Sequence, residues 1–250
     1  AVISQTDVSG TSTSSYLSDV FGGGVLYNMP ISEISTLGLG YDVTYTDFTT
    51  TPFSPIIVTH HIADHGNTSF GLSLKSSFVK DTRNRTVFAE TGRLSSISAE
   101  LFLGLEGASH TSLMYQTETN KGYVLKTFGF DWPTVLQAKT IIGLGFGLGS
   151  ATSLPFYNKY FAGGSGTVRG FKGSSLGPLT YNAPRSQNTC AAKAIPGKFI
   201  ECDAVGGDFL SAAQFNWIFT PPAFLGEDTR SLRTTLFIDV GNVFEKINNF

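Results

Sequence analysis

The sequence is dominated by long stretches in which apolar and polar side chains alternate with a period of two. In residues 36–46, every second residue is leucine, valine or tyrosine, and glycine, threonine or aspartate stands between them. This is the period of a β-strand, whose successive side chains point to opposite faces. The same pattern predicts strands over residues 70–80, 94–105, 136–148, 209–219 and 233–244, with weaker candidates over about 16–29 and 122–131.

Most of these expected strands have about ten to fourteen residues, whereas strands of soluble proteins commonly have about five or six. A strand that crosses a bilayer at a tilt needs about nine to eleven residues. Charged residues make up only 14% of the chain, which also contains 28 glycines and 21 phenylalanines. A soluble sandwich would carry more charge on its outer side. Length and composition therefore predict an all-β fold, an antiparallel transmembrane β-barrel with a polar lumen.

Charge and motifs argue against several classes of function. The formal net charge is −2 and the pI about 6.1, which does not suit a nucleic-acid-binding protein. No apolar run is long enough for a transmembrane helix, and the first residues lack the basic start and apolar core of a signal peptide. No serine, histidine and acidic residue stand in a recognisable catalytic motif, so we expect no enzyme and no cofactor.

Two local features resemble ligand sites only superficially. His60, His61 and His65 cluster in an expected loop, where histidines more often face water than a metal ion, so we expect no metal. The stretch from Gly163 to Gly170 is rich in glycine. It lacks the Lys-Ser/Thr ending of a phosphate-binding loop and does not open a helix after a parallel strand.

The connectors between the expected strands differ in length. Tight turns are expected at residues 28–32 and 131–134, longer loops at 48–67 and 106–120, and the longest loop at about 149–207. Short turns on one side and long loops on the other are typical of outer-membrane barrels. A loop as long as the last one is unusual in a compact domain, and such loops tend to be functional.

The two cysteines, Cys190 and Cys202, lie in this long loop, in a stretch with no strand pattern. We interpret them as a disulfide formed in an oxidising compartment. The alternative is a pair of free thiols in a cytosolic loop. A zinc site is a weaker alternative, because two cysteines without a nearby histidine fall short of four ligands.

The most specific stretch covers residues 156–178 and reads FYNKYFAGGSGTVRGFKGSSLGP. Its centre is Val168-Arg169-Gly170-Phe171. This run resembles the BamA family of outer-membrane protein assembly factors, in which it marks a long loop that folds back into the barrel. The cysteine pair and the residues VGG at 205–207, which lead into an expected strand, also resemble that family.

Two further motifs carry the resemblance, which extends from about residue 12 to residue 244. Asp81, Arg83 and Gly92 stand in a stretch similar to the family's D-x-R…F-P-T-x-G turn, although Ala89 replaces the usual proline and Glu90 follows it. We therefore expect a looser turn here. Residues 236–243, LFIDVGNV, resemble the family's F-x-D-x-G-x-V strand.

Arg169 needs a hydrogen-bond acceptor if its loop lies inside the barrel, since a guanidinium has only donors and stays charged. Asp239 lies on the polar face of its expected strand, so we predict that it pairs with Arg169 and pins the loop. In the family a second lumenal carboxylate often assists from one strand earlier. The matching position here is Asn216, which carries no charge, so we expect a weaker clamp. Gly170 would allow a backbone conformation that side chains disfavour.

The resemblance implies that residues 1–250 are the central part of one outer-membrane β-barrel domain, with about eight to ten strands of a sixteen-stranded barrel. It implies a location in the bacterial outer membrane and a function in folding and inserting β-barrel proteins. The implied partners are unfolded outer-membrane proteins, the lipoproteins of the assembly complex, the lipid bilayer and lipopolysaccharide. Nucleic acid is not among them.

Three alternatives remain open at this point. A sister translocation or assembly barrel that handles autotransporters would share the VRGF run. A passive porin-like channel would conduct steadily and would have no use for that run. A barrel enzyme would need a catalytic set at the mouth of the lumen.

Overall fold

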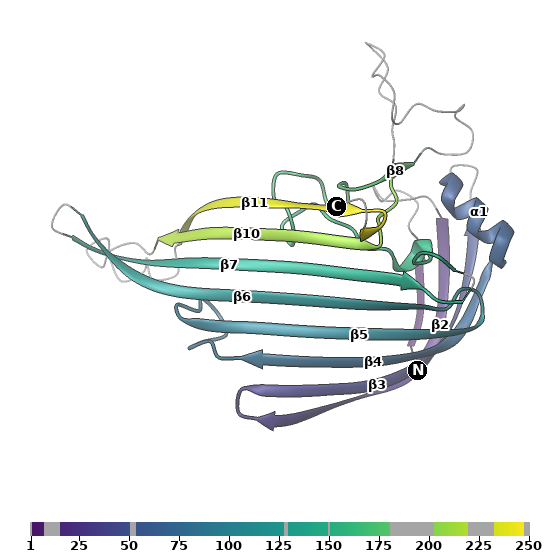
Figure 1. Ribbon diagram of the computed structural model, residues 1–250, viewed down its shortest axis with the longest axis horizontal. Coiled ribbons are helices and arrows are strands. Elements are labelled where there is room, and N and C mark those ends of the chain that lie inside the picture. Colours follow the sequence, from purple (N-terminus) through teal and green to yellow (C-terminus); the bar gives the residue numbers. More distant parts are fainter. Residues whose placement is uncertain are drawn as a thin grey trace, which may run out of the picture.

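A computed structural model describes residues 2–7, 16–50, 54–127, 130–149, 151–180, 203–219 and 233–247. It contains one large antiparallel sheet, which dominates the view in Figure 1. The strands of this sheet are β1 (Val2–Asp7), β2 (Tyr16–Ser32), β3 (Ser35–Thr50), β4 (Thr68–Asp81), β5 (Gly92–Glu106), β6 (His110–Thr127), β7 (Phe130–Gly147), β10 (Phe209–Phe219) and β11 (Thr234–Phe244).

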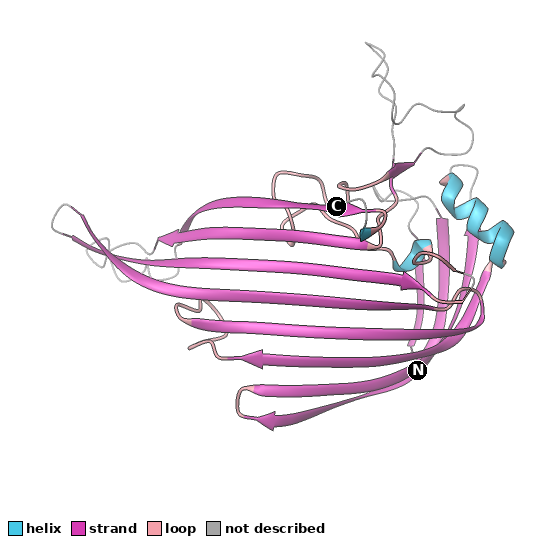
Figure 2. Ribbon diagram, in the orientation of Figure 1, coloured by secondary structure: helices cyan, strands magenta, loops and turns pink. Residues whose placement is uncertain are grey.

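The nine strands follow one another in the sheet in the order of the chain, so that each pairs with the next. Between β7 and β10 the chain leaves the sheet for the long loop and then returns beside β7. Figure 2 shows the strands curving together into one bent sheet. Among the described strands the order is linear and does not close on itself. The predicted partial antiparallel barrel is therefore confirmed.

The two faces of the sheet differ in the way the alternation predicted. On one face, large apolar side chains are exposed, among them Tyr41, Ile97, Phe215 and Ile238. On the other face, polar side chains such as Asn120 and Asn216 are buried. This is the inverse of a soluble protein and is the arrangement of a barrel wall between lipid and a polar lumen. No helix in the described part of the chain is long and apolar enough to cross a membrane.

The expectation of a long loop over residues 106–120 was wrong, because β6 begins at His110 and continues to Thr127. Its outward positions include Thr111, Thr117 and Thr119 in place of aliphatic side chains. Threonine, like valine, is common in strands. Because its side chain carries a hydroxyl, however, a threonine at an outward position obscures the alternation of apolar and polar residues in the sequence. The connector between β5 and β6 consists only of residues 107–109.

Two expected tight turns also lie inside strands. Residues 28–32 belong to β2, which turns into β3 at Glu33 and Ile34 instead. Residues 131–134 belong to β7, and the weak strand candidate at 122–131 runs across the end of β6 into β7. The described pairing of β7 with β10 begins only at Thr134, immediately after Pro133.

The connector between β3 and β4 contains a helix, α1 (Ile56–His65), that the sequence analysis did not predict. It begins after Pro55 and ends at Gly66, whose φ of 85° and N–H bond to Ile62 O close the last turn. In Figure 1 α1 stands at one end of the sheet. The first strand, β1, was not predicted either, because four of its six residues are polar and show no apolar alternation.

The long connector between β7 and β10 contains the short helix η1 (Phe156–Asn158) and a small ladder of β8 (Leu179–Thr180) with β9 (Asp203–Ala204). Its residues pack against the wall of the sheet in two apolar clusters. One joins Phe156 to Phe48 and to Val58 of α1. The other joins Ala162 to Leu210 and Val243. The predicted disulfide between Cys190 and Cys202 lies outside the described residues.

Candidate functional site

The loop residue Arg169 lies against β11, where it meets Asp239. Ile238 and Val240 on either side of this aspartate are exposed on the apolar face, so the strand alternation turns Asp239 inward. Arg169 Nε donates to Asp239 Oδ2 at 2.7 Å and Nη2 donates to Oδ1 at 2.5 Å. The backbone N–H of Arg169 also donates to Oδ2, at 2.8 Å. The Asp239 side chain is only 3% exposed, so this fork joins two charges in a water-poor place.

The guanidinium of Arg169 reaches a second strand and an aromatic ring. Its Nη2 donates to Asn216 Oδ1 at 2.6 Å. Its Cζ lies 3.8 Å from the ring centroid of Phe237, which is the partner of Asn216 in the β10–β11 register. The structure thus brings together Arg169, Asp239 and Asn216, all named from the sequence. Phe237 adds a cation–π contact that sequence reasoning did not identify as part of the site.

The neighbours of Arg169 have different environments. Val168 is buried, whereas Phe171 is more than half exposed. Gly170 has a φ of 87°, the left-handed region that glycine tolerates best. The ion pair with Asp239 raises the pKa of Arg169 above its already high ordinary value, so the loop carries this positive charge at every physiological pH.

Further contacts hold the backbone of the same loop to the wall. Gln214, buried on β10, donates from Nε2 to Thr167 O at 2.9 Å and to Ser165 O at 3.3 Å. Inside the loop, Gly163 N donates to Thr167 Oγ1 at 2.8 Å. The sequence analysis did not identify Gln214 as a loop contact, because no sequence signal specifies which loop a lumenal amide will meet.

Residues 159 and 160, near the start of the loop, are bonded to residues 207 and 208, which lead into β10. Tyr160 and Gly207 exchange two backbone hydrogen bonds, at 2.9 and 3.0 Å. The Tyr160 hydroxyl donates to Leu113 O at 3.1 Å. Lys159 Nζ lies 3.8 Å from Asp208 Oδ1, and both side chains are 6% exposed. Burial raises the pKa of the Asp208 carboxyl, and the charge of Lys159 opposes this shift.

Aromatic side chains join the loop to α1. The ring of Phe156 lies 5.1 Å from that of Phe48 and 5.1 Å from that of His61. His61 also stacks on His65 at 4.7 Å. Burial, with a smaller contribution from the charge of His65, lowers the pKa of His61 to about 4. Among the described residues no group of three histidine, cysteine or acidic side chains is placed to hold a metal ion.

The second predicted motif forms the connector between β4 and β5. Arg83 Nε and Nη2 donate to the two oxygens of Asp81 at 2.9 and 2.8 Å. Gly92 has a φ of 99°, and a Cβ there would lie 2.2 Å from Thr82 O, so only glycine fits. Asn84 Oδ1 accepts the backbone N–H groups of residues 90 and 91, which closes the turn without the proline that the family usually has.

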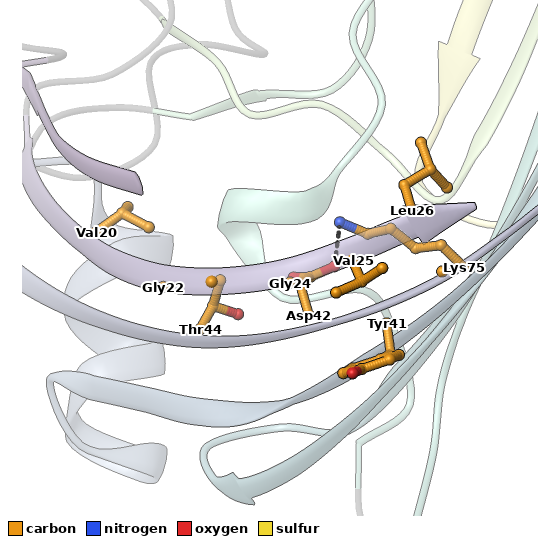
Figure 3. A pocket seen from close by; sticks show the side chains of 11 residues that line it. Val20, Gly22, Gly24, Val25, Leu26, Tyr41, Asp42, Thr44 and Lys75 are labelled. Carbon is orange, nitrogen blue, oxygen red and sulfur yellow. Dashed lines mark ion pairs between the residues drawn. The ribbon is translucent and has the colours of Figure 1, made fainter. Parts of the chain in front are cut away.

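A pocket of about 350 Å³ is lined by β2, β3 and β4, and Figure 3 shows the ion pair beside it. Lys75 Nζ lies 2.7 Å from Asp42 Oδ1 and 3.9 Å from Glu100 Oε1. A lysine between two carboxylates neutralises charge on the lumenal wall. Asp42 and Lys75 line this pocket, and the cluster belongs to the lumenal wall.

Comparisons with known proteins agree with this fold. The Omp85 superfamily domain matches residues 4–250. The outer membrane protein assembly factor BamA of Neisseria meningitidis serogroup B is 24% identical over 243 residues, which are 94% of this chain and 28% of that protein. The crystal structure of BamA from Haemophilus ducreyi lacking POTRA domains 1-3 superposes with a TM-score of 0.75 at 18% identity. The match covers 96% of this chain and 44% of that one.

This chain therefore spans less than half the length of each of these two relatives. The matches confirm the resemblance to the BamA family that the motifs indicated. Together with the long strands and the exposed apolar face, they locate the protein in the bacterial outer membrane. The chain belongs to the Omp85 superfamily.

Proposed function

We propose that this chain is the barrel portion of a factor that folds β-barrel proteins and inserts them into the outer membrane. The observation that carries the proposal is the Arg169–Asp239 anchor, which holds the VRGF loop on the lumenal wall. Its support comes from the family match and from the similarity to a BamA protein over nearly the whole chain. The function involves no chemical step and no cofactor.

The proposed partners are unfolded outer-membrane proteins as substrates, with accessory lipoproteins, the lipid bilayer and lipopolysaccharide around the barrel. The position of the loop argues against the alternative of a passive pore. Its residues from Phe156 to Gly177 contact the inner wall at several points, which would obstruct steady conduction. A sister barrel that translocates autotransporters would have the same anchor. The two functions are therefore distinguished by the substrate that the protein accepts.

The experiment is reconstitution of the complete gene product in lipid vesicles, with an unfolded outer-membrane β-barrel protein added from urea. Folding of the substrate is followed by its gel mobility shift and by protease protection. We expect faster folding than in vesicles without the protein, and a lower rate with Arg169→Ala. A protein that conducts ions steadily and leaves substrate folding unchanged would be a pore. Secretion of a passenger domain without insertion of barrels would identify a translocation barrel.

A further inference from the structure

Asn216 occupies the position at which the family often has a second carboxylate. In the structure this uncharged residue is hydrogen-bonded to further side chains of the lumenal wall. Asn216 accepts from Arg169 through Oδ1 and donates through Nδ2 to Gln137 Oε1 at 2.9 Å. Gln137 in turn donates through Nε2 to Glu118 Oε1 at 3.1 Å. Two amides therefore link the guanidinium of the loop to a carboxylate on β6.

The strand register accounts for this line of contacts. Gln137 on β7 is directly paired with Asn216 on β10 and with Asn120 on β6. Directly opposed residues in antiparallel strands have their Cβ atoms about 5 Å apart, so the three amides share one row of the lumenal wall. Asn120 is 4% exposed and Asn216 7%. In such a water-poor row, consecutive hydrogen bonds polarise one another.

Arg169 and Glu118 stand at the two ends of this chain of hydrogen bonds, and their charges determine which way each amide group is oriented. Arg169 has only donors, so it requires an oxygen from Asn216. Glu118 has only acceptors when ionised, so it requires an N–H from Gln137. Asn120 supports the same direction, since its Nδ2 donates to Glu118 Oε1 at 2.9 Å and its Oδ1 accepts from Gln137 at 2.8 Å. Reversing either amide would oppose donor to donor.

We propose that Glu118 is the second acidic anchor of the VRGF loop and acts on Arg169 through Gln137 and Asn216. Glu118 and Gln137 are positioning residues, because neither touches Arg169. Glu118 also lies 3.7 Å from Arg83 Nη1 and 3.4 Å from Lys139 Nζ. The same carboxylate therefore connects the loop to the Asp81–Arg83 turn between β4 and β5. This inference rests on the proposed function in one respect, which is that anchoring the loop matters for assembly.

The test measures hydrogen exchange of residues 163–171 in the complete protein folded in lipid. Glu118→Gln and Gln137→Leu are compared with the wild type and with Glu100→Gln. The last is a matched control, because Glu100 is another carboxylate of the lumenal wall and pairs with Lys75. We expect about fivefold faster exchange of the loop in the first two variants, since each loses a hydrogen bond to a charged group. The control should exchange at the wild-type rate.

Asn216→Asp distinguishes loss of the amide link from a general destabilisation of the loop. It brings a negative charge directly to Arg169, so adding Glu118→Gln to it should leave loop exchange unchanged. Wild-type exchange in both Glu118→Gln and Gln137→Leu would overturn the proposal, as would failure of Asn216→Asp to rescue Glu118→Gln. If Gln137→Leu does not fold, Glu118→Gln and its rescue decide the matter.

The anchor itself is tested separately by Asp239→Asn. If this variant leaves loop exchange unchanged, the Arg169–Asp239 anchor is wrong. If it loosens the loop while the Glu118 and Gln137 variants do not, the anchor stands and the amide link is wrong. Loss of the proposed assembly activity is read from the vesicle assay, so failure of the proposed function would be seen independently of loop exchange.

Discussion

Arg169 and Asp239 lie 70 residues apart in the chain and form a two-pronged ion pair, in which Nε and Nη2 of the arginine meet the two oxygens of the aspartate at 2.7 and 2.5 Å. A third bond, from the backbone N–H of Arg169, ends on the same carboxylate. The carboxylate thus fixes both the side chain and the backbone of the loop at one point. The Asp239 side chain is almost completely buried, so removal of Arg169 would leave a buried carboxylate without its counter-charge.

Arg169→Lys should loosen the loop although it keeps the charge. An ammonium on a flexible stem does not reproduce the planar fork that meets Asp239 and Asn216 together, so we expect a loss of about 2 kcal/mol of loop anchoring. Limited proteolysis within residues 163–177 measures this as faster cleavage. Lys172→Ala is the control, since Lys172 is exposed in the same loop. Equal cleavage of the two variants would refute the geometric argument.

Gly92→Ala should destabilise the barrel by about 2 kcal/mol. The φ of 99° is unfavourable for alanine, and the added Cβ would lie 2.2 Å from Thr82 O and 2.7 Å from the Cα of Arg83. Stability is measured by urea titration of the folded band in lipid vesicles. Gly23→Ala is the matched control, because a Cβ at Gly23 would meet nothing within 4 Å. An unchanged midpoint for Gly92→Ala would show that the turn adapts.

Lowering the pH from about 6.5 to 4 should weaken the packing of α1 on the loop. The pKa of His61 is about 4 in the folded protein, below its ordinary value of 6.5. Between these values the unfolded segment binds more protons than the folded one, so stability falls as the pH falls through this window. Above pH 6.5 this contribution is constant.

Hydrogen exchange of residues 56–65, corrected for the intrinsic effect of pH, measures this change. His61→Asn should remove most of the pH dependence. His60→Asn should retain it, because His60 is exposed on the same helix. If the two variants show the same pH dependence as the wild type, burial of His61 does not control the packing of α1.

Ile97→Arg should destabilise the folded barrel by about 2 to 4 kcal/mol if Ile97 lies near the middle of the bilayer. Ile97 is exposed on the apolar face of β5, and the neighbouring Ser98 faces the lumenal pocket beside Tyr160. Ser98→Arg is therefore expected to cost much less. Folding equilibria in vesicles compare the two. A greater cost for Ser98→Arg would mean that the faces are assigned the wrong way round.

The strand regions could be predicted because their causes are local. Alternation over residues 36–46 and 94–105 follows from burial on one face and lipid on the other, and the sheet reproduces both stretches as β3 and β5. The errors arose where local signals are ambiguous. Threonine at outward positions concealed β6, and Pro133 suggested a turn inside β7. The helix α1 depends on contacts of Val58 with Phe48 and Phe156, which its own sequence does not reveal.

The sequence by itself determined the period of the strands, the direction in which Asp239 faces, and the need of Arg169 for an acceptor, since these follow from alternation and from the chemistry of single side chains. Only the tertiary structure decided which strands stand side by side, and therefore which amide meets which charge. The row of Asn120, Gln137 and Asn216 exists because β6, β7 and β10 pair in one particular register. A shift of one residue would turn Gln137 to the lipid, and no local pattern specifies that register across the long loop.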